Sequence, residues 1–162
     1  MPTRDHPGEW INYIGQVLIE LMRASNLSYI AALPDNQIIY GFTELPLSYP
    51  NVYVIPISEP GLTPSLRGDQ IELQTKFMIV VEGSSPDLVT TDDQLRLILG
   101  DIITIVLTNR PLTYNGNPTV RDTHIFNIDA EYLPPNEQND IRRWVMMTII
   151  CNKKLTVSTV TS

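Results

Sequence analysis

The chain is organised around one stretch, Gln70-Ile-Glu-Leu-Gln-Thr-Lys-Phe-Met-Ile-Val-Val-Glu82. Apolar and polar side chains alternate through its first half, as they do in a β-strand with one face on a core. From Phe77 to Val81 both faces are apolar, which indicates that this end lies in the centre of a sheet and is covered on each side. The stretch therefore predicts a central strand whose two ends have different surroundings.

Two apolar patterns on either side of this strand predict helices. Residues 9–24 place Trp10, Ile14, Val17, Leu18, Leu21 and Met22 on one stripe, which is typical of a helix packed on a core. Thr91-Asp-Asp-Gln94 fits a capping box and predicts the start of a second helix that continues to Leu107. Because this second helix is apolar almost all round, we expect a surface besides its own sheet to cover it.

Further strands are expected at residues 38–42, 52–57, 124–132 and 144–151. Pro56 has no amide hydrogen, so it belongs at a strand end or a sheet edge. The stretch 144–151 is apolar on both faces, and we expect it to be central and to pair antiparallel with the strand before it.

The connections are rich in turn residues. Residues 58–68 contain two prolines and two glycines and are expected to stay outside the core. Asn115-Gly116 predicts a tight turn, and residues 134–140 predict a loop. The tail, residues 155–162, is expected either to be disordered or to add as a strand to a neighbour.

This element order predicts an α+β fold in a single domain, residues 1–162, with its core over about residues 9–154. The expected sheet is mainly antiparallel, with about four to five strands. Two helices pack on one of its faces, and long loops connect the elements.

Composition excludes several classes of protein. The 162 residues carry a formal net charge of −7, the wrong sign for a protein that grips nucleic acid by its phosphates. No apolar segment reaches the length of a membrane span, and the polar start lacks the layout of a signal peptide, so we expect an intracellular product. The single cysteine agrees with this expectation. Only 18% of the residues are charged, which suits a surface used in assembly.

No pattern predicts catalysis, a metal site or a cofactor. The histidines are His6, near the start, and His124, which shares the parity of an apolar strand face and is expected to be structural. Cys151 lies in an apolar strand, where a thiol is usually inert. Asp129 and Glu131 lie on one strand face, where solvation explains them better than a shared ion. The glycines form no nucleotide-binding motif.

A resemblance emerges from four segments taken together. They are the helix from Trp10 to Met22, the strand ending in Phe-Met-Ile-Val-Val-Glu82, the apolar helix over residues 91–107, and the closing strand Arg143-Trp-Val-Met-Met-Thr-Ile-Ile-Cys-Asn152. In their order and in their patterns of apolar residues, these segments resemble the bacteriophage tail terminator, or tail-completion, proteins. The likeness covers about residues 9–154 and rests on element order rather than on a motif.

The resemblance implies a structural virion protein rather than an enzyme. Members of this family form a hexameric ring that caps the tail tube, stops its polymerisation and offers a joining surface to the head. The implied partners are further copies of the chain, the tail tube protein and neck or connector proteins. The implied location is the virion tail or neck, after assembly in the host cytoplasm. A ring of negative charge would let DNA pass without specific binding.

Two sets of residues follow as hypotheses for the contacts of such a ring. The subunit interface is expected to use the second helix and the most concentrated positive site, although Arg142-Arg143 is also explained by a solvated strand entry. The residues expected at this interface are Ile102, Ile103, Val106, Arg142 and Arg143. Loops are expected to reach neighbouring rings, although Arg67-Gly-Asp69 also reads as a plain turn. The residues expected there are Leu62, Arg67, Asp69, Asn115 and Gly116.

Three alternatives stay open at this point. The chain has the size expected of another phage neck or tail-tube component. An acidic secretion chaperone, which acts as a dimer, fits the acidity and the opening helix, although that family usually closes with a third helix. A small enzyme or ligand-binding domain would use His124 with Asp129 or Glu131 and would require a pocket.

Overall fold

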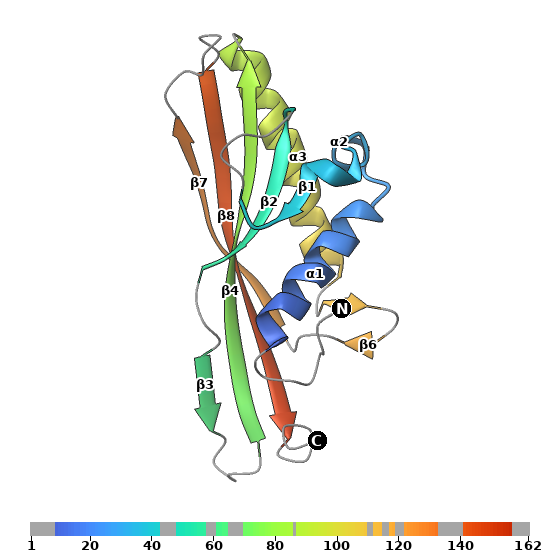
Figure 1. Ribbon diagram of the computed structural model, residues 1–162, viewed down its shortest axis with the longest axis vertical. Coiled ribbons are helices and arrows are strands. Elements are labelled where there is room, and N and C mark those ends of the chain that lie inside the picture. Colours follow the sequence, from blue (N-terminus) through green and yellow to red (C-terminus); the bar gives the residue numbers. More distant parts are fainter. Residues whose placement is uncertain are drawn as a thin grey trace.

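A computed structural model gives the fold of the protein (Figure 1). The residues it describes are 9–42, 48–57, 61–64, 70–85, 87–109, 112–114, 117–118, 122–132 and 141–156. Within them, no helix is long and apolar enough to cross a membrane.

The main sheet has six strands in the order β1-β2-β4-β8-β7, and β3 pairs with β4 off this path. Only β1 and β2 are parallel. The strands are β1 (Ile38–Tyr40), β2 (Asn51–Pro56), β3 (Gly61–Pro64), β4 (Gln70–Ser85), β7 (Asp122–Tyr132) and β8 (Ile141–Thr156). The predicted α+β class with a mainly antiparallel sheet is confirmed, and β8 is central and antiparallel to β7, as expected.

Helices cover one face of this sheet (Figure 1). They are α1 (Trp10–Arg23), the single-turn α2 (Ser28–Ala31), the 3-10 turn η2 (Asp35–Gln37) and α3 (Leu88–Thr108). Helix α1 packs over β1 and β2, whereas α3 packs over β4 and β8. Both long helices therefore lie on the same side, which we call the helix side. The opposite side carries no helix among the described residues, and we call it the helix-free face.

The core lies between the helices and the sheet. Alternate residues of β2, β4 and β8 point into it, because neighbours along a strand face opposite sides. These residues are Val52, Val54, Phe77, Ile79, Val81, Val145, Met147, Ile149 and Cys151, and all are buried. They meet the buried stripe of α1 that includes Ile14, Leu18 and Met22, as the helical spacing predicts.

The approach of α1 to the sheet is set by a glycine and an arginine. A Cβ at Gly15 would collide with the ring of Tyr40, so only glycine lets the helix come this close to β1. At the other end of the helix, the Arg23 guanidinium donates to the carbonyl of Ile38 over 2.8 Å. These two contacts hold the short strand β1 against α1.

Helix α3 begins earlier than its sequence predicts. Asp87 precedes the first turn, and its carboxylate accepts the backbone N–H of Thr90 at 3.3 Å and the Thr90 hydroxyl at 2.7 Å. Thr91 is inside the helix and donates its hydroxyl to the carbonyl of Asp87. The capping box predicted at Thr91 is therefore wrong, because an acidic residue four positions earlier supplies the cap.

The sequence does not predict two of the short elements, β3 and α2. Strand β3 lies inside the connector 58–68 and pairs antiparallel with the lower end of β4. Helix α2 is capped from far away in sequence, since the Asp101 carboxylate of α3 accepts the N–H groups of Tyr29 and Ile30 at 2.8 and 2.9 Å. The pairing of β3 with β4 and the cap of α2 by Asp101 join residues that are distant in sequence. The local pattern of apolar and polar residues therefore cannot predict these two elements.

A β-bulge interrupts the pairing of β7 with β8. The pairing with β8 shifts by one residue between Ile125 and Asn127, which is the register shift of a β-bulge. The backbone of His124 is in register with that of Ile150, and the backbone of Ile128 with that of Met147. The side chains of β7 lie outside the described part of the structure, so the expectation that His124 shares the apolar strand face stays a prediction.

Two further predictions concern segments outside the described residues. Strands β5 (Thr113–Tyr114) and β6 (Asn117–Pro118) pair antiparallel on either side of Asn115-Gly116, but these two residues are themselves not described. The loop at 134–140 and residues 157–162 of the tail also lie outside the described part.

Candidate functional site

A buried carboxylate marks the helix-free face. Glu82 lies near the end of β4 and is 0% exposed, although none of the helices that the structure describes covers its side of the sheet. The register places it between Asn51 of β2 and Trp144 of β8. A buried carboxylate is costly unless it is paired and hydrogen-bonded, so its partners explain how it is tolerated.

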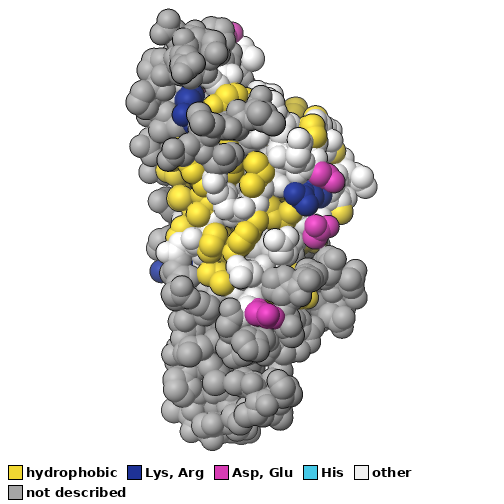
Figure 2. Space-filling model, viewed as in Figure 1, with side chains coloured by type: hydrophobic (Ala, Val, Ile, Leu, Met, Phe, Trp, Pro, Cys, Tyr) yellow, Lys and Arg dark blue, Asp and Glu magenta, His cyan; other side chains and the backbone are white. Residues whose placement is uncertain are grey.

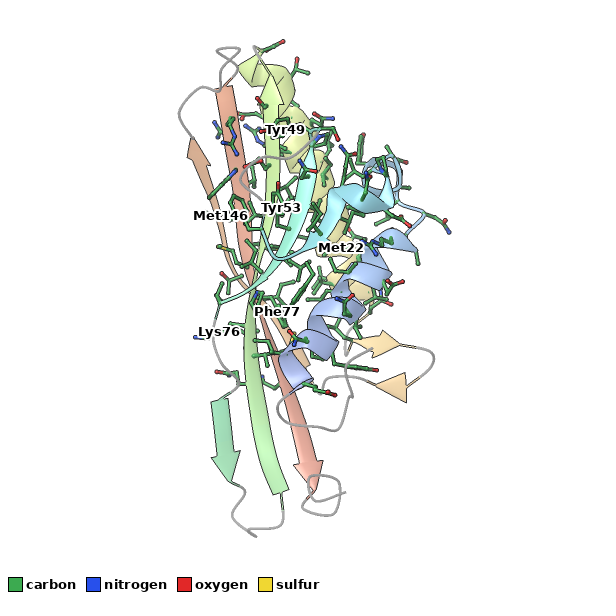
Figure 3. The ribbon with its side chains drawn as sticks, viewed as in Figure 1. Met22, Tyr49, Tyr53, Lys76, Phe77 and Met146 are labelled. Atoms are coloured by element: carbon green, nitrogen blue, oxygen red, sulfur yellow. The ribbon has the colours of Figure 1, made fainter. Side chains whose placement is uncertain are left out.

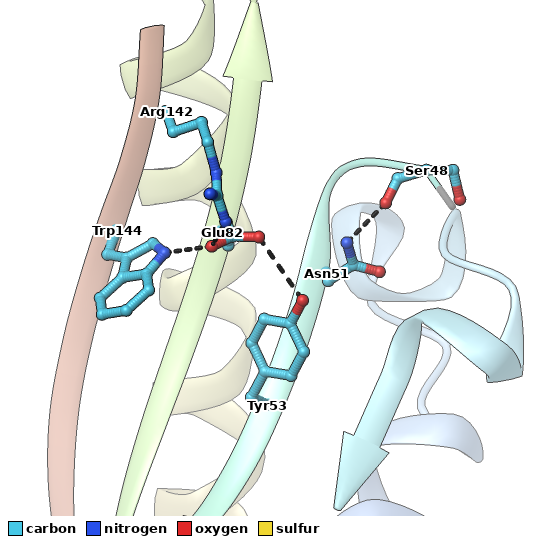
Figure 4. Close-up of polar contacts among 6 residues, drawn as sticks. All are labelled: Ser48, Asn51, Tyr53, Glu82, Arg142 and Trp144. Atoms are coloured by element: carbon cyan, nitrogen blue, oxygen red, sulfur yellow. Dashed lines mark hydrogen bonds and ion pairs between the residues drawn. The ribbon is translucent and has the colours of Figure 1, made fainter. Parts of the chain in front are cut away.

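Three side chains from two neighbouring strands donate to Glu82 (Figure 4). The Arg142 guanidinium donates from Nη2 to Oε2 over 2.9 Å, and the indole N–H of Trp144 donates to the same oxygen. The Tyr53 hydroxyl donates to Oε1 over 3.5 Å. The carboxylate thereby ties β2, β4 and β8 together on this face.

Aromatic rings cover this cluster. The ring of Phe42 lies 5.0 Å from that of Tyr53 and 5.4 Å from that of Trp144, the second pair being edge-to-face. Gly41, with φ of 92°, turns the chain out of β1 just before Phe42. Phe42 itself remains 41% exposed, so it is both a cover of the cluster and part of the surface.

The electrostatics of the cluster favour a static role. Burial, reinforced by the charge of Glu82, raises the pKa of Tyr53 well above its usual range, so the phenol stays protonated as a donor. Both Glu82 oxygens already accept hydrogen bonds from the chain itself. A carboxylate held in this way lacks the access that a general base needs.

Cys151 is the buried thiol of the helix side. Burial raises its pKa to about 12, so the thiolate is not formed at neutral pH. This agrees with the inert role predicted for it. Within the described residues, no group of three or more His, Cys, Asp or Glu side chains is placed to hold a metal ion.

Beyond the Glu82 cluster, the helix-free face carries apolar side chains that are only partly covered. We call them the sheet patch, which consists of Phe42, Ile55, Ile57, Met78, Met146 and Ile150. The register places the strand residues on one face, with Ile55 beside Met78 and Ile150 beside Lys76. Figure 2 shows hydrophobic side chains gathered across the middle of the molecule, and Figure 3 marks Met146 and Lys76 on these strands.

Part of the predicted subunit interface needs correction. Ile102 and Val106 are buried in the core of the chain itself, so they have no surface to offer to a second copy. Ile103 is half-buried at the edge of the core. The outward face of α3 instead exposes Leu97 and Leu107, at 43% and 54%.

The two predicted arginines point to opposite sides of β8. Arg142 pairs with Glu82 on the helix-free face, whereas Arg143 forms an ion pair of 2.6 Å with Asp92 of α3 on the helix side. Each therefore has a carboxylate partner within its own chain, which the sequence does not reveal.

The predicted ring-to-ring residues are mostly beyond the described part of the chain. Leu62 belongs to β3, where its backbone is in register with Leu73. Arg67, Asp69, Asn115 and Gly116 lie outside the described residues.

The Glu82 cluster itself was missed at the level of sequence. Its signals were a glutamate closing an apolar strand and an Arg-x-Trp pair that must share a strand face. Only the register of β4 against β8 brings these signals together.

The fold is of the α+β class, and a similar fold is found in a chain of known structure. No family model matches the sequence, and no curated protein matches it either. The chain is similar to a chain in the solved structure of the virion of a native gene transfer agent (GTA) particle, with a TM-score of 0.57. The match covers 88% of this chain and 98% of the other at 10% sequence identity. At this identity the similarity shows the fold alone.

Proposed function

We propose that the chain is a structural component of a phage-like virion. The observation that carries this proposal is the match along nearly the whole of a chain from a gene transfer agent virion. The predicted resemblance to tail terminators came from element order and points to the same class of particle. Because one fold can host many functions, the site has to support the proposal as well.

The site supports assembly better than chemistry. Both carboxylate oxygens of Glu82 accept hydrogen bonds from the chain itself, and the Cys151 thiol is buried with a raised pKa. The sheet patch, by contrast, leaves apolar side chains such as Ile57 in contact with solvent. A subunit that buries such a surface against another protein gains free energy by the hydrophobic effect.

Within this class we propose the tail terminator role, in which a hexameric ring caps the tail tube and presents a joining surface to the head. The net charge of −7 on each copy supports a channel that repels DNA phosphates and lets the genome pass. In this proposal the chain is not an enzyme and needs no cofactor. Its partners are its own copies, the tube protein and the neck proteins.

Polymerisation of the tail tube tests this role. Tube protein from the same particle is allowed to polymerise with and without the purified chain, and tube lengths are measured by electron microscopy. A terminator is expected to shorten the tubes and to form a ring at one end of each. Tubes of unchanged length and without an end ring would contradict the terminator role.

A further inference from the structure

One ion pair fixes how the two sides of the molecule are aligned. Arg143 of β8 reaches Asp92 in the first turns of α3 over 2.6 Å, so these two points lie at the same height along the sheet. The residue before Arg143 and the residue after Asp92 both turn away from this pair. Arg142 faces the helix-free side, where it contacts Glu82, and Asp93 is exposed on α3.

Arg142 and Asp93 are complementary in charge. The Arg142 side chain is 21% exposed, and its ion pair with Glu82 is made through Nη2. Asp93 makes no ion pair within the described part of the chain. A guanidinium carries five N–H donors, so it can donate to a second carboxylate while it is paired with Glu82.

Exposed apolar side chains lie near both Arg142 and Asp93. On the helix-free side, Phe42 lies against Trp144 beside the Glu82 cluster, and the rest of the sheet patch continues toward Lys76. On α3, Leu97 is one turn beyond Asp93, and Leu107 is exposed near the end of the helix. Helix α3 runs back along the sheet from the end of β4 (Figure 1). Along this direction, each side of the molecule therefore presents its charged residue first and its exposed apolar residues after it.

We propose that the sheet patch of one copy packs against the outward face of α3 of the next copy, with Arg142 opposite Asp93 and Phe42 opposite Leu97. Because the two surfaces differ and lie on opposite sides of the molecule, this contact is head-to-tail and closes a ring when the rotation between copies allows it. The inference rests on the proposed function, and it names the two surfaces that build the ring.

A mixing experiment tests this contact. Leu97→Asp damages only the α3 face, and Ile57→Asp damages only the sheet patch; both residues are exposed, so each variant is expected to fold. Asn12→Asp on α1 is the matched control, because it adds the same charge on an exposed helix position and can still accept from the Tyr40 hydroxyl. Native mass spectrometry measures the assembly of each protein, and circular dichroism checks the fold.

Each damaged variant is expected to be monomeric at concentrations roughly tenfold or more above those at which the wild type and the control assemble. An equal mixture of the two variants is expected to form a dimer of one copy each and nothing larger, because only one intact pair of surfaces remains. Wild-type rings that persist in Leu97→Asp would overturn this contact and leave the proposed ring standing. A wild type that is monomeric at every concentration would overturn both.

Discussion

The two faces of the central sheet are built by the same three strands and differ in what covers them. On the helix side, residues such as Phe77 and Ile149 are closed off by α1 and α3 and form the core. On the helix-free face, a buried carboxylate and its aromatic neighbours lie next to apolar side chains that stay partly exposed. One face therefore holds the subunit together, while the other is the better candidate for holding subunits to one another.

The largest effect is expected from a charge placed on the helix side. Ile102→Asp buries a carboxylate without a partner and is expected to cost at least about 5 kcal/mol, enough to unfold a domain of this size. Leu107→Asp, on the outward face of the same helix, is expected to change the unfolding free energy by less than about 0.5 kcal/mol. Urea unfolding measures both. Similar stability of the two variants would break the distinction between core and surface on α3.

The next effect concerns the helix-free face. Glu82→Gln keeps the shape of the side chain but leaves Arg142 beside a neutral amide, and it is expected to lower the unfolding free energy by about 3 kcal/mol. Tyr53→Phe removes only the long hydrogen bond to Glu82 and is expected to cost about 1 kcal/mol. If thermal unfolding ranks these variants in the opposite order, the carboxylate is not the centre of the cluster.

Alkaline pH probes both faces at once, because each buries an acid with a raised pKa. Burial raises the pKa of the Cys151 thiol from 9.0 in the unfolded chain to about 12 in the folded protein. The contribution of this group to the unfolding free energy is therefore complete below pH 9 and is lost as the pH rises toward 12. The unfolding free energy should fall by about 1.4 kcal/mol per pH unit in this window for each such group. Cys151→Ala should flatten the decline from pH 9, and Tyr53→Phe should flatten only the part above about pH 10. Identical slopes in the wild type and Cys151→Ala would show that the thiol is not protected by the helices.

The smallest effect is expected at the cap of α2. Asp101→Ala removes the carboxylate that accepts the N–H groups of Tyr29 and Ile30, and it is expected to cost about 1 kcal/mol. Hydrogen exchange at these two amides should rise, while that of the β4 core amides stays protected. Unchanged exchange at Tyr29 and Ile30 would mean that the cap adds nothing to the helix side.

The sequence pattern predicts the long elements well, since their periodicity is local. Residues 9–24 and the strand around Phe77 match α1 and β4 closely, because packing on a core imposes the spacing. It fails where a partner distant in sequence decides the outcome. Examples are the cap of α2 by Asp101 and the pairing of β3 with β4.

The candidate site could be predicted only in fragments for the same reason. Arg142 was expected at a surface or an interface, and the structure shows that it is also bound to Glu82, 60 residues away in sequence. The sequence predicts Ile102 and Val106 at an interface because α3 is apolar almost all round, yet both residues are buried in the core of the chain itself. A helical pattern gives the amount of apolar surface, but only tertiary packing shows which part of it is left over.

If the chain assembles through surfaces that its own fold leaves open, its mass in solution must exceed that of one subunit. Light scattering over a concentration series is expected to give six times 18.3 kDa, either throughout or as concentration rises. A mass that stays at one subunit would contradict assembly, and a tight dimer would contradict the ring.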